Sequence, residues 1–194
     1  MITGANGQIG IPLVRSIVKE VGPTGSVIAS DVGDAKVDFG TKYTTLDITD
    51  VKKYQDLVKD NKIDYIVHLA AILSASGELY PDKALEVNVN GAITAMNLAR
   101  EVGAKLFLPS TIAVFGGDKF QKDKTPADSI LQPTTMYGVS KVFNEQLGTY
   151  YNKKFGVDFR CMRYPGVISS EKYAFNGTAM YSTCKKDIFL NVIL

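Results

Sequence analysis

The chain has 194 residues, 45% of them apolar and 22% charged, with a formal net charge of +2. This balance is ordinary for a globular domain with a sizeable core. Its lysine pairs are scattered, which excludes a concentrated basic footprint for nucleic acid. No run approaches the roughly 18 apolar residues of a membrane span, and a single histidine, His68, argues against a zinc site, so we expect no metal.

The two cysteines, Cys161 and Cys184, lie far apart and lack a CxxC spacing. Two free thiols suit a reducing compartment. The sequence also shows no charged-then-apolar leader of the secretory type. We therefore expect a cytoplasmic protein, or one of the mitochondrial matrix if an organelle address precedes Met1.

Short apolar runs alternate with longer amphipathic stretches along the chain. In order, we expect strands at 26–30, 43–46, 64–71, 105–110 and 157–164, and helices at 10–21, 51–59, 81–102 and 136–155. Strands that are apolar throughout suit a parallel sheet buried on both faces. The alternation predicts an α/β fold, a Rossmann-like doubly wound parallel sheet with helices on both faces. The long polar segment 111–135 favours a functional loop.

The chain opens with MITGANGQIG, in which Gly4, Gly7 and Gly10 lead into the first expected helix. Small residues let the backbone approach a pyrophosphate, and a helix N-terminus offers N–H donors to it. Asp31 follows the second expected strand. An acid there accepts both hydroxyls of an adenosine ribose and repels a 2′-phosphate, so we expect NAD rather than NADP. The alternative is that Asp31 is a solvated loop acid.

Tyr137 and Lys141 stand four residues apart in TTMYGVSK and share one face of the last expected helix. The ordinary pKa of tyrosine is about 10. A cation four residues away favours the phenolate, so we expect a lowered pKa for Tyr137. Such a tyrosine takes a proton from a substrate alcohol while hydride leaves its carbon. The pair alone is unremarkable, and it gains weight from the glycine turn upstream and from PSTIAVFG after a strand.

Four motifs, TGANGQIG, HLAA, STIAVFG and YGVSK, stand in the order of the extended short-chain dehydrogenases/reductases, the group of the sugar-nucleotide epimerases and dehydratases. The chain resembles this family over nearly its whole length. Segments such as HLAAILSASGE and PTTMYGVSKVFNEQLG are most similar to its short-chain type of L-threonine 3-dehydrogenase. The resemblance implies NAD-dependent oxidation of L-threonine to 2-amino-3-oxobutanoate. The alternatives are a sugar-nucleotide epimerase or dehydratase, and a non-catalytic NAD-binding fragment.

The resemblance also implies the residues of the site. Thr111 orients the substrate oxygen, Tyr137 is the acid and base, and Lys141 tunes Tyr137 and binds the nicotinamide ribose. Further substrate contacts are implied for Ser74, in a loop after the fourth strand, and for Gly177 and Thr178. The other implied cofactor-binding residues are Gly4, Gly7, Gln8, Ile9 and Gly10 at the pyrophosphate, Asp47 and Ile48 at the adenine, Leu69, Ala70 and Ala71 along the cofactor, and Tyr164 and Ile168 near the nicotinamide.

Several of these side chains have a plain structural alternative. Ser74 is also suited to capping a turn, and Thr111 to ending a strand. We expect His68 and Asn88 to pack or hydrogen-bond inside the protein, since Tyr137 already supplies the base.

The resemblance divides the chain into an NAD-binding domain, 1–164, and the start of a substrate-binding lobe, 165–194. Related enzymes dimerise through two long helices, so we expect a homodimer formed by 81–102 and 136–155. Only three residues precede the glycine turn, where a strand of about 5–6 residues is usual. We therefore expect a truncated enzyme whose substrate lobe is largely missing, with weakened NAD binding, little threonine turnover and marginal stability.

Overall fold

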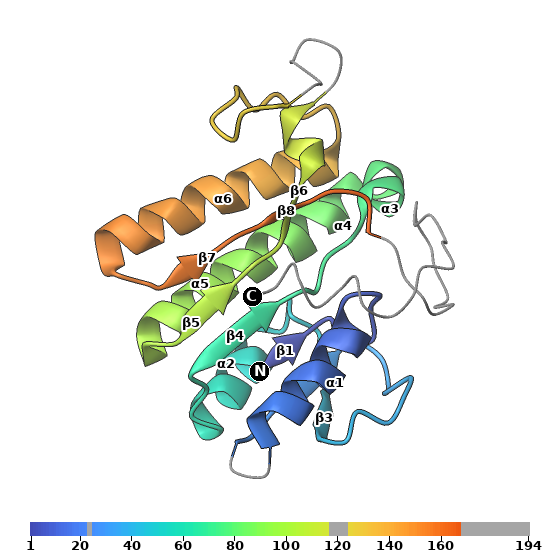
Figure 1. Cartoon of the computed structure of the whole chain (residues 1–194), viewed down its shortest axis with the longest axis vertical. Helices are drawn as coiled ribbons and strands as arrows, with labels where there is room; N and C mark the ends of the chain where they lie inside the picture. The colour runs from blue at the N-terminus through green and yellow to red at the C-terminus, as the bar shows by residue number, and fades with distance from the viewer. Residues whose placement is uncertain (23–24, 117–123, 168–194) are drawn as a thin grey trace.

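A computed structural model describes residues 1–22, 25–116 and 124–167 (Figure 1). Its main element is a six-stranded sheet with the strand order β3-β2-β1-β4-β5-β7, in which all neighbours are parallel. The order reverses between β1 and β4, as in sheets that bind dinucleotides. The expected doubly wound α/β fold is confirmed. The strands are β1 (Ile2–Thr3), β2 (Ile28–Asp31), β3 (Lys42–Thr45), β4 (Tyr65–His68), β5 (Lys105–Phe107) and β7 (Phe159–Arg160).

Helices cover both faces of this sheet (Figure 1). On one face lies α1, where Ile11 and Val14 pack against Ile2 and Ala29. The other face carries a larger core, centred on buried Tyr54, Met96 and Leu106. The helices are α1 (Gly10–Val21) on the first face and α2 (Val51–Asp60), α5 (Gly91–Val102) and α6 (Met136–Phe155) on the second.

Local signals explain why two helices have the bounds that the sequence predicts. Thr135 caps α6, because its hydroxyl accepts a hydrogen bond from the Gly138 N–H. Gly156 ends α6 with a φ of +71°, the left-handed conformation that glycine adopts without strain. α1 also spans the residues expected for it, and Gly22, which has a φ of +62°, ends it.

The helix expected at 81–102 is interrupted. It consists of α4 (Pro81–Leu85), a π-helical turn (Glu86–Asn90) and α5. The wide turn accompanies an inward Asn88, whose side-chain amide both accepts from the Ile72 N–H and donates to the Ile72 carbonyl. Asn88 therefore has the structural role expected of it, and the interruption is a correction that no hydrophobic periodicity indicates.

The strand expected at 157–164 is also divided. Its first part is β7, at the edge of the main sheet, and its second is β8 (Arg163–Tyr164), which pairs with β6 (Ser110–Thr111) in a separate two-stranded sheet. Segment 111–135 is likewise not all loop, since it begins within β6 and continues into a 3-10 helix (Ile112–Phe115). The choice of strand partners is non-local, which is why the sequence of 157–164 does not show where the strand divides.

Within the described residues, no helix is both long and apolar enough to cross a membrane. The lobe expected at 165–194 lies outside the described residues except for its first three.

Candidate active site

The glycine turn connects β1 to α1 at the carboxyl edge of the sheet. Gly4 has a φ of +71°, and a Cβ there would lie 2.6 Å from the backbone nitrogen of Ala70. Only glycine fits this position, because both the backbone conformation and the close approach exclude a side chain. The N–H groups of Ile11 and Leu13 already donate to the Gly7 and Ile9 carbonyls, and the helix has no side-chain cap. The donors that suit an anion are therefore those of the turn just before, at Gln8, Ile9 and Gly10. These features fit the pyrophosphate of NAD.

Asp31 ends β2 beside this turn, as the sequence predicts. One carboxylate oxygen accepts from the Asn6 N–H at 2.9 Å and the other from the Val32 N–H at 2.8 Å. These bonds fix the orientation of the carboxylate. Because each oxygen has two acceptor positions, each keeps one for a ribose hydroxyl. The arrangement fits the adenosine ribose of NAD.

The residues expected along the cofactor differ in their exposure to solvent. Leu69, Ala70 and Ala71 follow β4 directly and are half-buried, with Leu69 and Ala70 against Gly4. Asp47 is exposed, and hydrogen bonds from the backbone and hydroxyl of Thr49 hold the pKa of its carboxyl below the usual value.

Ile48 differs from the expectation in part. It is 5% exposed, and its side chain packs closely on Gly91 within the core. Its side chain is therefore not available for the expected adenine contact, and only its backbone could make one.

Gln8 and Ile9 lie in the glycine turn, with Gly7 and Gly10 on either side. The Gln8 amide donates a hydrogen bond to the Val167 carbonyl at 3.2 Å. This contact brings the segment that follows β8 toward the turn, and the expected nicotinamide neighbour Tyr164 is the last residue of β8. Tyr164 is half-buried, which raises the pKa of its hydroxyl.

Tyr137 and Lys141 occupy the first two turns of α6 and share one face of it. The Lys141 Nζ lies 5.5 Å from the centre of the Tyr137 ring and donates to the Pro109 carbonyl at 2.8 Å. Lys141 is 4% exposed, and this burial lowers its pKa to about 8, an effect that nearby Cys161 only partly offsets. A lysine ammonium has three donors, so two remain for the Tyr137 oxygen and a ribose hydroxyl.

The expected lowering of the Tyr137 pKa is wrong for this arrangement. Burial raises the pKa of Tyr137 above its ordinary value. The cost of removing a phenolate from water outweighs the attraction of the Lys141 charge. Burial also disfavours the protonated form of Lys141, because it lowers the pKa of that side chain.

Thr111 stands in β6, opposite Tyr164 of β8. Its hydroxyl oxygen accepts from the Ala113 N–H at 3.2 Å, so the hydroxyl proton is left to donate. The first turn of α6 packs tightly on this segment, since a Cβ at Gly138 would lie 2.7 Å from the Ala113 carbonyl oxygen. The fold thus brings the segments that carry Thr111 and Tyr137 into contact.

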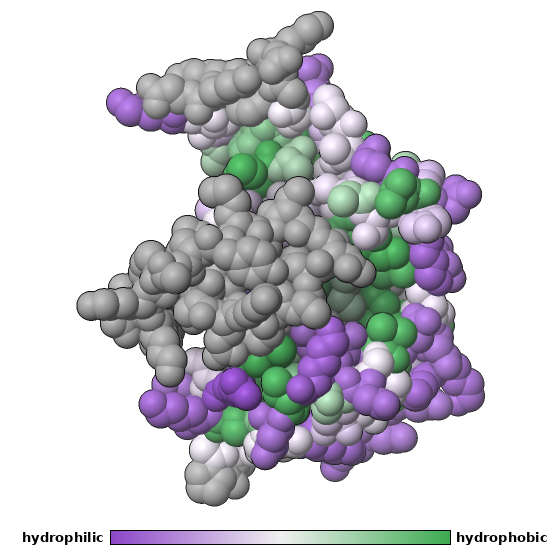
Figure 2. All heavy atoms as spheres, turned by 90° about the vertical axis from the view of Figure 1, so that its right-hand side faces the viewer, coloured by the Kyte–Doolittle hydropathy of each residue, from purple (hydrophilic) through white to green (hydrophobic). Residues whose placement is uncertain are grey.

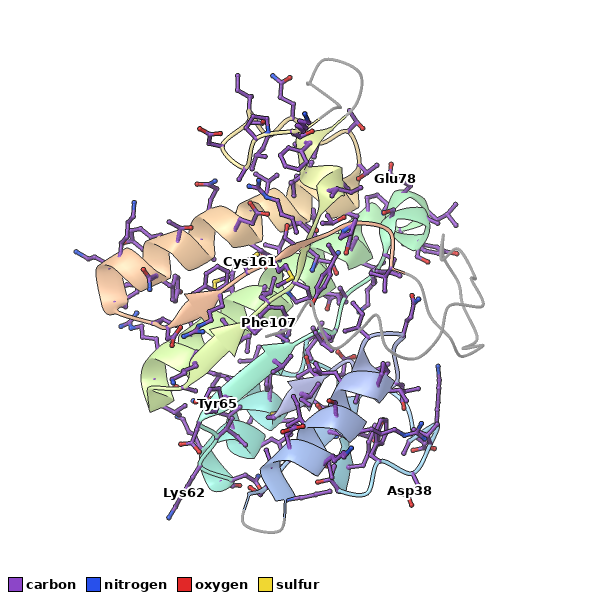
Figure 3. The ribbon with its side chains drawn as sticks, viewed as in Figure 1. Asp38, Lys62, Tyr65, Glu78, Phe107 and Cys161 are labelled. Atoms are coloured by element: carbon purple, nitrogen blue, oxygen red, sulfur yellow. The ribbon has the colours of Figure 1, made fainter. Side chains whose placement is uncertain are left out.

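Ser74 is the first residue of a short helix, α3 (Ser74–Leu79), and not part of a loop. At the far end of α3, the Glu78 carboxylate accepts a hydrogen bond from the Met136 N–H at 2.7 Å, at the start of α6 (Figure 3). α3 is therefore fixed against the helix that bears Tyr137. Ile168, Gly177 and Thr178 lie outside the described residues.

An ion pair that the sequence analysis missed supports this arrangement. Arg163 of β8 meets Glu145 of α6 through two hydrogen bonds, of 2.9 and 2.7 Å. The same carboxylate accepts from the Ser110 hydroxyl, and Arg163 also donates to the Ala127 carbonyl. The sequence did point to Glu145 as a residue near the site, because it follows Lys141 by one helical turn on the same face.

Glu78 and Asn6 were missed as well. Neither has a sequence pattern that reveals its partners, which are distant in the chain: backbone groups for both and, for Asn6, also the Tyr43 hydroxyl.

A glycine turn, a ribose-directed acid and a Tyr/Lys pair at one edge of a doubly wound sheet define a dinucleotide-binding protein of the short-chain dehydrogenase/reductase class. Sequence comparison gives the same assignment at a finer level. The chain belongs to the NAD dependent epimerase/dehydratase family, whose sequence profile matches residues 1–186. The cofactor of this family is NAD.

Individual relatives extend the comparison. An uncharacterised epimerase/dehydratase of Staphylococcus aureus is 43% identical over 94% of this chain and 57% of its own length. The structure of L-threonine 3-dehydrogenase from Trypanosoma brucei is 42% identical, with a TM-score of 0.85 over 91% of this chain and 56% of that one. A monomeric L-threonine 3-dehydrogenase of metagenomic origin is 42% identical, with a TM-score of 0.83 over 88% and 55%. The chain thus spans little more than half the length of these relatives.

Proposed function

We propose that the chain carries the NAD site and the proton-transfer residues of an enzyme that oxidises L-threonine to 2-amino-3-oxobutanoate. The observation that carries the proposal is the contact between α6, with Tyr137 and buried Lys141, and the segment of Thr111. The substrate is supported by the likeness to two L-threonine 3-dehydrogenases at 42% identity.

The proposed roles follow from the chemistry of each side chain. Tyr137 accepts the proton of the threonine hydroxyl, and the Thr111 hydroxyl donates a hydrogen bond to the same oxygen. Lys141 favours the phenolate through its charge and binds a ribose hydroxyl with a free donor. NAD, when bound, accepts the hydride from the carbon that carries the hydroxyl. The proton and hydride leave one alcohol, so the products are a ketone, NADH and a proton.

The cofactor contacts form a second part of the proposal. The backbone N–H groups of the glycine turn hold the pyrophosphate, and Asp31 holds the adenosine ribose. Asp47, the backbone of Ile48 and residues 69–71 border the cofactor, and Ser74 contacts the amino acid from α3.

The proposal is tested by measuring which substrate reduces NAD. Purified chain is incubated with NAD and separately with L-threonine, L-serine, L-allo-threonine and UDP-glucose, and NADH is followed by fluorescence. We expect NADH with L-threonine above all others. Conversion of the sugar nucleotide without net NADH would instead favour an epimerase, and NAD binding without either reaction would favour a non-catalytic NAD-binding protein.

A further inference from the structure

Asn6, inside the glycine turn, holds the loop between β2 and β3. Its Nδ2 donates to the Asp34 carbonyl at 2.9 Å and to the Tyr43 hydroxyl at 3.0 Å, and its Oδ1 accepts from the Lys36 N–H at 3.0 Å. Its backbone N–H is the group that binds the Asp31 carboxylate. Asn6 is 6% exposed, so these bonds form largely out of water.

Tyr43, in β3, completes the same network from the opposite side of the loop. Its hydroxyl donates to the Gly33 carbonyl at 2.5 Å while it accepts from Asn6. Its ring stacks on buried Phe39, with the centres 5.6 Å apart and the planes within 4°. Burial, with a further contribution from the Asp31 charge, raises the pKa of the hydroxyl, which therefore remains a donor.

The loop itself offers little alternative support. Residues 32–41, between β2 and β3, contain no helix or strand in the part of the chain that the structure describes. Asp38 marks this loop in Figure 3. Two side chains therefore fix three backbone positions within four residues, Gly33, Asp34 and Lys36, next to Asp31.

We propose that Asn6 and Tyr43 are positioning residues for cofactor choice, which hold loop 32–36 so that the Asp31 site admits a ribose diol and has no room for a 2′-phosphate. Asp31 supplies the charge repulsion, and the fixed loop supplies the steric limit. Without the clamp, the loop retreats and the larger group gains space. The inference rests on NAD binding and not on the oxidation of threonine.

The test measures the dissociation constants of NAD and NADP by calorimetry for the unaltered chain and two variants. Asn6→Ala removes the clamp but keeps the backbone N–H that binds Asp31. Tyr43→Phe removes one hydroxyl and keeps the stack on Phe39. It is therefore the milder variant, and it tests the clamp if Asn6→Ala fails to fold. For each, we expect the dissociation constant of NAD to rise roughly three- to ten-fold, and the preference for NAD over NADP to fall at least about three-fold.

Two matched variants control for the loss of an amide and of a phenol elsewhere. Asn152→Ala removes an amide that donates to the Val157 carbonyl at the end of α6. Tyr65→Phe removes an exposed hydroxyl at the amino end of β4, away from Asp38 (Figure 3). Neither should change the preference between the cofactors.

A merely structural network would weaken both cofactors in parallel and leave their ratio unchanged, and that result would overturn the inference. Failure of the unaltered chain to bind NAD would overturn it together with the cofactor assignment. NAD binding without threonine oxidation would overturn the proposed function alone, because the cofactor ratio is measured without substrate.

Discussion

His68 is a buried side chain whose protonation the fold opposes. It is 3% exposed, its Nδ1 lies 3.2 Å from the hydroxyl oxygens of Thr3 and Tyr54, and its ring stacks on Tyr54. Burial, followed by the Lys141 charge, lowers its pKa to about 3, from about 6.5 in the unfolded chain. Its structural role agrees with the sequence-based expectation.

This difference predicts a pH-dependent stability. Between pH 6.5 and 3 the unfolded chain binds a proton at His68 and the native chain does not, so stability falls as the pH falls. The contribution approaches 1.4 kcal/mol per pH unit, or about 2 kcal/mol at pH 5. Urea unfolding at pH 7 and pH 5 measures it, with His68→Gln as the comparison. Equal losses of stability in the two proteins would show that His68 is not responsible.

At the scale of elements, the Glu145–Arg163 pair joins α6 to the small sheet of β6 and β8. The side chains are 12% and 25% exposed, and a two-residue strand pair is weak by itself. Glu145→Gln should therefore lower the free energy of unfolding by about 2 kcal/mol, because the partly buried Arg163 loses its counter-charge.

Urea unfolding compares this variant with Asp56→Asn, which breaks the exposed pair of Lys52 and Asp56. The control should cost less than about 0.5 kcal/mol. A loss for Glu145→Gln as small as the control's would mean that the ion pair does not hold the small sheet to α6.

The elements also show what a sequence can predict. α1 and α6 were predicted to the residue because amphipathic spacing and the glycine that follows each helix are local properties. The division of 157–164 between two sheets, the π-helical turn around Asn88 and the clamp of Asn6 depend on partners distant in the chain. For the same reason, Tyr137 and Lys141 were placed correctly on one helix face, while the direction of the Tyr137 pKa shift, which depends on burial, was not.

For the whole molecule, the expected homodimer remains a prediction. α6 exposes apolar side chains at Val139, Phe143 and Tyr150, which are 46%, 42% and 52% exposed. Their spacing forms one stripe along the helix, suited to a second copy. One relative is described as monomeric, so membership of the family does not decide the question.

Light scattering after gel filtration should show a dimer that Phe143→Glu converts to monomer. The control is Leu79→Glu on α3, which also exposes an apolar side chain (73%). α3 and α4 lie on the side of the molecule that faces the viewer in Figure 2. On that side, green apolar groups and purple polar groups are mixed. A monomeric unaltered chain, or a dimer unaffected by Phe143→Glu, would reject the α6 interface.

The central claim is that Tyr137 transfers the proton in an NAD-dependent oxidation of L-threonine. The most direct measurement is threonine-dependent NADH fluorescence from the unaltered chain, Tyr137→Phe and the exposed control Tyr150→Phe, at high protein concentration. We predict that Tyr137→Phe lowers the rate at least about 100-fold, with the dissociation constant of NAD changed less than about two-fold, and that Tyr150→Phe changes neither. A Tyr137→Phe protein that kept most of the rate would contradict the account.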